Sequence, residues 1–135
     1  MKVSEVVGAL SLLALVAVLV LPRMQQGNLR ARRAKATSDI QALSAALDKY
    51  RVDNGSYPTE DQGLKALRQE PKAAPAPRHW AGPYLDRDVP LDPWGRPYVY
   101  LCPGKHNPHR FDLFTTGADG KDGGVGEDAD VGNWE

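Results

Sequence analysis

Cysteine and net charge are both scarce in this sequence. Cys102 is the only cysteine among 135 residues, so a disulfide within the chain is excluded. The 17 Lys and Arg residues balance 17 Asp and Glu residues, which leaves a formal net charge of zero. A neutral chain lacks the basic excess with which nucleic-acid-binding proteins neutralise phosphates. We therefore expect no nucleic-acid partner, and we expect Cys102 to be a small buried hydrophobic residue.

Residue sets that serve enzymes are missing as well. No Ser/His/Asp or Cys/His set stands in a supporting context. Beyond the first fifty or so residues only about 80 remain, which suffices for one small domain but not for a generous cleft. His106 and His109 have a spacing that zinc sites use, but no Cys or third His accompanies them. We predict a protein without enzymatic activity and a solvated loop at these histidines.

One long apolar run stands at the start of the chain. Between Val6 and Leu21 only one glycine and one serine interrupt the aliphatic residues. As a helix that rises about 1.5 Å per residue, this run crosses most of a bilayer. Glu5 at its front costs roughly 2.5–3.5 kcal/mol in a membrane unless a positive charge meets it. The α-amino group of Met1 on a neighbouring copy lies at the same depth, which predicts a head-to-tail helical polymer.

Other interpretations of the apolar run compete with this one. A secretory signal peptide has only Ala34-Lys35-Ala36 as a cleavage pattern, far past the run and behind several arginines. A plain single-span anchor leaves Glu5 unexplained, and a core helix of a soluble domain does not fit so uninterrupted a stretch. The basic residues from Arg23 to Lys35 favour the cytoplasmic side, which disagrees with a polymer whose globular part lies outside the cytoplasm.

Helical periodicity returns after an expected break. Pro22 removes a helix hydrogen bond and Gly27 adds backbone freedom, so we expect a kink or an unwound stretch near Pro22. The next apolar residues then recur at helical spacing and define one face: Ala36, Ile40, Leu43, Leu47 and Tyr50. Asn54-Gly55 is a stop signal. The pattern predicts one broken helix from about Val3 to Asp53, whose second half is the spine of a globular domain.

Shorter elements follow this helix. Thr59 and Gln62 form a capping-box pattern that opens a short helix from Glu60 to about Gln69. Four prolines between Glu70 and Pro83 predict an extended loop without regular structure. Tyr98–Cys102 and Phe111–Thr115 are rich in β-branched and aromatic residues, which predicts two strands.

A turn precedes the strands. In Asp92-Pro93-Trp94-Gly95, Asp92 can accept bonds from the backbone, Pro93 fixes φ, and Gly95 allows a positive φ. We predict a structural role for this turn, with Trp94 as an aromatic plug rather than a ligand-binding residue.

The stretch from Gly117 to Asp130 contains five carboxylates and five glycines. Calcium takes six to eight hard oxygens from carboxylates and backbone carbonyls, and glycines let the backbone aim carbonyls inward. The EF-hand pattern is absent. Residues 123–128 resemble half of a calcium-binding nonapeptide repeat, but that architecture needs stacked copies. From the residues alone, a calcium site and a solvated acidic loop are equal alternatives.

These motifs together resemble a known family. Glu5, the aliphatic run and Pro22 look like the mature N-terminus of a type IV pilin or a type II secretion pseudopilin. Two further motifs, Asn54-Gly55-x-Tyr57-Pro58-Thr59-x-x-Gln62-Gly63-Leu64 and Asp92-Pro93-Trp94-Gly95, narrow the resemblance to the major pseudopilin, general secretion pathway protein G. An adhesive type IV pilin, which often carries a disulfide, and a membrane-anchored periplasmic calcium-binding module are the alternatives.

The resemblance implies an α+β fold of the type IV pilin class. A long N-terminal helix, transmembrane in its first half and kinked near Pro22, packs on a small antiparallel sheet with a C-terminal calcium loop. Residues 1–27 form the transmembrane and filament-core helix. Residues 28–135 form a periplasmic globular domain, with a spine helix (28–53), a variable helix and loop region (54–97), and strands with the acidic loop (98–135). The implied location is the bacterial inner membrane, crossed once.

The resemblance also implies a function, partners and ligands. A prepilin peptidase removes a basic leader and methylates the Met1 amine, and Glu5 pairs with that amine on the next copy. The helical homopolymer is a periplasmic pseudopilus that helps export folded proteins across the outer membrane, with minor pseudopilins and an inner-membrane assembly platform as partners. One structural calcium is implied, with these ligands: Asp119, Asp130, Asp128 or Glu127, and the backbone carbonyls of Thr116 and Lys121.

Overall fold

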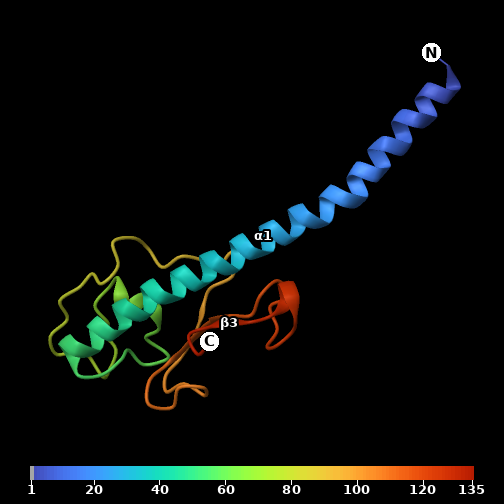
Figure 1. Ribbon diagram of the computed structural model, residues 1–135. Helices are drawn as coiled ribbons and strands as arrows, with labels where there is room; N and C mark the ends of the chain where they lie inside the picture. The colour runs from blue at the N-terminus through green and yellow to red at the C-terminus, as the bar shows by residue number, and fades with distance from the viewer. Residues whose placement is uncertain (1) are drawn as a thin grey trace. The chain divides into compact units, whose positions relative to one another are not determined.

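The computed structural model describes residues 2–135 (Figure 1). Its elements are the α-helix α1 (Val3–Asn54), the 3-10 helix η1 (Leu64–Leu67), the strands β1 (Val99–Leu101) and β2 (Asp112–Thr115), the 3-10 helix η2 (Gly126–Asp128) and the strand β3 (Val131–Gly132). The chain separates into two units, Met1–Arg32 and Arg33–Glu135, whereas the sequence places the boundary between residues 27 and 28. Each unit is described by itself.

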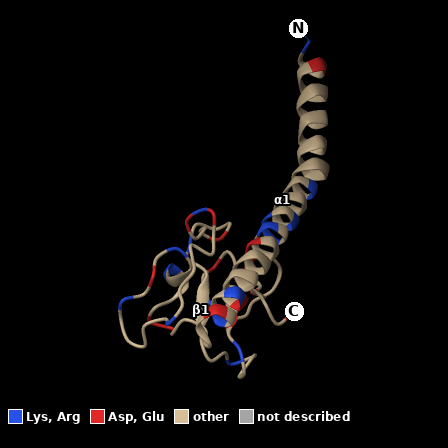
Figure 2. Cartoon of the chain, turned by 90° about the vertical axis from the view of Figure 1, so that its left-hand side faces the viewer, with Lys and Arg blue, Asp and Glu red and all other residues tan. Residues whose placement is uncertain are grey.

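The first unit is helix α1 up to Arg32. It contains an 18-residue window of mean hydropathy 2.5, none of which is buried, and by length and composition the helix can cross a membrane. Its leucines and valines from Val3 to Leu21 expose between 40 % and 79 % of their surface. Figure 2 shows no charged residue along this stretch between the acidic residue near its start and the basic cluster that follows. Since nothing within the unit covers this surface, the helix needs an apolar environment.

Pro22 does not break helix α1. The helix is continuous from Val3 to Asn54 with Pro22 inside it, so the expected unwound stretch is wrong. The physical reason is that proline withholds only one N–H, the one that would bond the carbonyl of Val18. The turns on either side keep their own hydrogen bonds, and an exposed helix can bend slightly around the ring without unwinding.

The second half of α1 is the spine of the second unit, as the periodicity predicts. All five residues of the predicted face are buried, and Leu47 exposes none of its surface. The core that packs on this face comes from η1, from the sheet and from the residues that precede β1 and β2: Leu64, Leu67, Tyr98, Tyr100, Phe111, Leu113 and Val131. Burial of each large apolar side chain stabilises the fold by about 1.5–3 kcal/mol. Cys102 is half-buried at the edge of this core, not fully buried as expected.

The sheet has three antiparallel strands in the order β1-β2-β3. Val99 pairs with Phe114, and Thr115 pairs with Val131. The two predicted strands are confirmed within one residue at their ends, but the two-residue β3 is missing from the prediction. Asn133 extends β3 with side-chain bonds, because its Oδ1 accepts from the backbone N–H of Leu113 at 3.0 Å and its Nδ2 donates to a neighbouring carbonyl.

The segment between α1 and the sheet contains the predicted capping box. The backbone N–H of Thr59 donates to Oε1 of Gln62, and the N–H of Gln62 donates to Oγ1 of Thr59, both at 3.1 Å. The short helix expected from Glu60 to about Gln69 is present only as the four-residue 3-10 helix η1, so its predicted length is wrong. Gly63 adopts a φ of +61°, which a helix interior does not allow. The proline-rich stretch that follows has no helix or strand, as predicted.

Candidate metal site and assembly segment

The acidic loop, residues 117–130, leads from β2 to β3 and closes on itself. The backbone N–H of Ala118 donates to the carbonyl of Glu127 at 2.9 Å. The N–H of Lys121 donates to Oδ1 of Asp119, and the N–H of Gly123 donates to Oδ2 of Asp130, both at 3.0 Å. A side chain on Gly117 would meet the backbone of residues 127–129 within 2.9 Å. Glycine is therefore required where the two ends of the loop meet.

The predicted calcium ligands lie in this loop but are not gathered into a side-chain cluster. Asp119, Glu127 and Asp128 are exposed, Asp130 and Thr116 are half-buried, and Lys121 is exposed. Within residues 2–135 no three acidic, histidine or cysteine side chains stand close enough together to hold a metal. The carboxylates predicted as joint ligands are thus on one loop, without convergence on one point.

One oxygen in the loop nevertheless fits a cation. Among residues 2–135, Oδ1 of Asp130 is buried without a hydrogen-bond partner, although Oδ2 of the same carboxylate accepts from the backbone N–H of Gly123. A buried carboxylate oxygen without a partner is costly. Hard oxygens of this type are what calcium prefers, so the donor chemistry of the loop fits the ion.

Two arginines bind the backbone of the acidic loop. Nη1 and Nη2 of Arg96 donate to the carbonyls of Gly117 and Ala118, at 2.7 and 2.9 Å. From α1, Arg33 donates to the carbonyls of Ala129 and Asp130, at 3.2 and 3.5 Å. Sequence analysis assigned no role to either arginine. Both arginines bind backbone carbonyl oxygens, and no pattern of residue types in the sequence indicates such contacts.

The Asp-Pro-Trp-Gly turn presents Arg96 to the loop. Asp92 is buried, and its Oδ1 accepts from the backbone N–H groups of Trp94 and Arg96, at 3.0 and 2.8 Å. Its Oδ2 accepts from the hydroxyl of Thr115 at the end of β2. Gly95 has a φ of +85°. The predicted backbone bonds of Asp92 and positive φ of Gly95 are both present, so the turn is a rigid support that ties Arg96 to β2.

Glu5 lies in the first turn of α1, and its side chain is exposed. The Met1 amine, its predicted partner, lies outside the described residues. The pairing between copies therefore stays a prediction.

The comparisons with known proteins decide the family. The family model described as type II secretion system (T2SS), protein G, matches residues 23–134. The chain belongs to this protein G family. The type II secretion system core protein G of Pseudomonas aeruginosa is 44 % identical over 131 residues, which is 97 % of this chain and 91 % of that protein. The same-named protein of Vibrio cholerae is 46 % identical over 131 residues, covering 96 % and 87 %.

A solved structure agrees with the sequence relatives. The crystal structure of the major pseudopilin from the type 2 secretion system of enterohaemorrhagic Escherichia coli superposes with a TM-score of 0.67 at 42 % identity, covering 78 % of this chain and 84 % of that one. The resemblance stated from the sequence is thus confirmed, as is the α+β pilin-like fold of a long N-terminal helix and a small antiparallel sheet. The protein G match favours a pseudopilin over an adhesive pilin.

Asp112 is a buried carboxylate of this protein G chain that sequence analysis missed. It accepts hydrogen bonds from the backbone N–H groups of Lys105, His106 and Asn107, at 2.8–3.0 Å. Burial alone raises the pKa of its carboxyl, but these donors outweigh burial and hold the pKa below its usual range. The ring of His106 also stacks on Trp134 at 3.8 Å. The loop that contains His106 is therefore exposed to solvent, as predicted, but the bonds to Asp112 and the stacking on Trp134 hold it in place.

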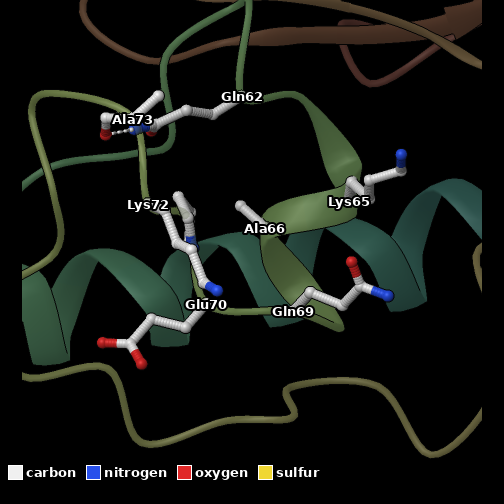
Figure 3. A pocket seen from close by; sticks show the side chains of 8 residues that line it. Gln62, Lys65, Ala66, Gln69, Glu70, Lys72 and Ala73 are labelled. Carbon is white, nitrogen blue, oxygen red and sulfur yellow. Dashed lines mark hydrogen bonds between the residues drawn. The ribbon is translucent and has the colours of Figure 1, made fainter.

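A hollow of the protein G chain lies beside η1 (Figure 3) and has a volume of about 520 Å³. Gln62 on its rim donates from Nε2 to the carbonyl of Ala73. Lys65, Glu70 and Lys72 spread away from one another around it, without convergence on a common point. The residues that line it include no histidine, cysteine or serine.

Proposed function

We propose that this protein G family member is the repeating subunit of the periplasmic pseudopilus of a type II secretion system. Copies assemble through their N-terminal helices into a filament that helps export folded proteins across the outer membrane. The role is structural, not catalytic.

The first unit of helix α1 is the observation that carries this proposal. Its apolar surface is fully exposed over a length that can cross a membrane, with Glu5 as the one acidic residue between Val3 and Arg32. Such a surface is covered first by lipid and then by the helices of neighbouring copies. A lone carboxylate at the front of the apolar run is costly in either environment, which supports a specific partner on the next subunit.

In the proposal, that partner is the α-amino group of Met1 on the neighbouring copy, and the ion pair sets the register between subunits. A prepilin peptidase exposes and methylates this amine. The mass of the N-terminal peptide from the native cell checks the processing step, because an unmethylated Met1 contradicts it. The chain crosses the inner membrane once, with its second unit in the periplasm. It works with minor pseudopilins and an inner-membrane assembly platform.

The second part of the proposal is one structural calcium ion in the acidic loop. The unpartnered oxygen of Asp130 supports it. Asp119, with Asp128 or Glu127, supplies further carboxylate oxygens, and the carbonyls of Thr116 and Lys121 complete the set. When bound, the ion neutralises the crowded carboxylates and holds the loop in place.

The substitution Glu5→Ala tests the assembly role. We expect no filaments from this variant, because the subunits lose the pair that fixes their register. The second unit stays folded, which its near-ultraviolet circular dichroism reports, and the chain still inserts in the membrane. Glu70→Ala, at an exposed carboxylate of the second unit, is the matched control and should assemble normally. Normal filaments from Glu5→Ala refute the pairing.

A further inference from the structure

The acidic loop is bound at its entry by Arg96. This half-buried guanidinium donates to two consecutive carbonyls, those of Gly117 and Ala118. A side chain on Gly120 would come within 2.8 Å of Cζ of Arg96. Gly120 therefore leaves the space that the guanidinium occupies, and the loop is shaped around the arginine.

The same loop is bound at its exit by Arg33. This arginine extends from α1 and donates to the carbonyls of Ala129 and Asp130. Asp130 is also the residue with the unpartnered buried oxygen, so Arg33 holds the backbone of the residue that fits the ion best. The two arginines are 63 positions apart in sequence (96 − 33), yet they bind the two ends of one loop.

We propose that Arg96 and Arg33 are positioning residues that fold the acidic loop into its calcium-binding conformation before the ion arrives. The inference rests on the calcium role proposed above. The planar guanidinium suits this task, because its several N–H groups in a fixed fork can bind two carbonyls at once. A lysine carries the same charge on one ammonium group and lacks that geometry.

The arginines do not compete with calcium for oxygens. The carbonyls they bind belong to residues 117, 118, 129 and 130, whereas the proposed backbone ligands are those of Thr116 and Lys121. Each arginine thus fixes the chain beside a ligand and leaves the ligand free. A loop ordered in advance loses less conformational entropy when the ion binds, which tightens binding.

Charge and geometry predict opposite effects, so variants can separate them. A positive arginine near the loop repels calcium, so the loss of charge alone tightens binding. The loss of positioning weakens binding. Arg96→Lys keeps the charge and removes the two-carbonyl geometry, whereas Arg96→Gln removes both. The same pair of substitutions at Arg33 repeats the test at the loop exit.

The experiment uses the full chain in detergent micelles. Calcium affinity is measured by isothermal titration calorimetry, and amide hydrogen exchange is measured in chelator by mass spectrometry. We expect Arg96→Lys to raise the Kd for calcium about tenfold, which corresponds to the loss of about one charged hydrogen bond. Arg96→Gln should raise the Kd by a smaller factor, because the loss of a repelling positive charge offsets part of the lost positioning. The amides of Ala118 and Gly123 exchange faster in both variants without the ion. Arg78→Lys, in the exposed proline-rich stretch, is the control and changes neither quantity.

Three outcomes contradict parts of this picture in different ways. If the wild-type chain binds no calcium, the calcium role fails, and loop exchange in chelator still tests the positioning role alone. If calcium binds and the lysine variants match wild type in both measurements, the inference is overturned. If only the glutamine variants change and they bind calcium more tightly, the arginines act through charge alone, and the inference is overturned as well.

Discussion

Two long loops of the second unit are held in place by different chemistry: the proline-rich loop (residues 70–83) and the acidic loop (residues 117–130), which contains the short 3-10 helix η2. The proline-rich loop lies beside the end of α1, and the acidic loop lies between β2 and β3 (Figure 1). Neutral side chains and aromatic rings hold the proline-rich loop in place. Arginines and internal carboxylate bonds hold the second.

Hydrogen bonds and a ring contact within the chain hold the proline-rich loop in place. Gln62 donates from Nε2 to the carbonyls of Ala73 and Pro75, both at 3.0 Å. The indole N–H of Trp80 donates to the carbonyl of Ala66 at 3.0 Å, and its ring meets Tyr84 edge to face at 5.7 Å. These contacts need no ion.

The acidic loop lacks such apolar fastening. Its side chains are short or charged, and one buried oxygen of Asp130 stays without a partner. A loop with almost no apolar residues of its own is thus bound at both ends by arginines and leaves one buried carboxylate oxygen without a partner among the described residues.

Trp80→Ala tests the apolar fastening. We expect a loss of about 3 kcal/mol in the free energy of unfolding, the low end for tryptophan because Trp80 is only half-buried. Urea denaturation of the full chain in micelles measures the change. Lys72→Ala, at an exposed position of the same loop, is the control and should stay within about 0.5 kcal/mol of wild type. A Trp80→Ala loss as small as the control's contradicts the fastening role.

Calcium removal tests the acidic loop. With free calcium at about 100 times its Kd, binding adds about 2.7 kcal/mol to the free energy of unfolding, so a chelator should lower the Tm by about 10 °C or more. Asp130→Asn should remove most of this response, because the amide replaces the open carboxylate oxygen. Trp80→Ala should keep the response in full. Identical wild-type melting curves with and without chelator would defeat the calcium proposal.

The sequence predicts the parts of this molecule whose causes are local. The buried face of α1 is visible because residues such as Ile40, Leu43 and Leu47 repeat with the helical period. The hydrogen bonds that Asp92 accepts from the backbone and the positive φ of Gly95 follow from the turn preferences of the four residues 92–95. Motifs of this length also carried the family resemblance.

The sequence does not predict structural features that depend on one or two residues, or on contacts between residues far apart in the chain. The short helix expected after Thr59 is reduced to the 3-10 helix η1 because Gly63 takes a positive φ, although the capping box before it is correct. Strand β3 is too short to show a period of two. The roles of Arg33 and Arg96 depend on backbone carbonyls far along the chain, and the open oxygen of Asp130 depends on three-dimensional burial. Neither the arginine contacts nor the burial of this oxygen produces a recognisable pattern in the sequence.

The buried carboxylate of Asp112 should make the stability of the second unit depend on pH. Because donors hold the pKa of Asp112 below its usual range, its contribution is fully present above the unfolded pKa of about 3.9. The contribution is lost as the pH falls through the lower folded pKa. Urea denaturation in chelator between about pH 5 and about pH 2.5 should show this loss in wild type and a shallower slope in Asp112→Asn. Equal slopes would show that Asp112 is not the responsible group.

Gln62→Glu should have the smallest and most local effect. The carboxylate keeps an acceptor for the N–H of Thr59, so the capping box survives, but it loses the Nε2 donor that holds Ala73 and Pro75. We expect a loss of about 1 kcal/mol and faster amide exchange at Ala73 and Ala74, with no change in the acidic loop. Gln69→Glu, an exposed neighbour of the same type, controls for the added charge. Faster exchange in both loops would mean that the two are coupled, and the contrast between a self-sufficient loop and an ion-dependent one would then fail.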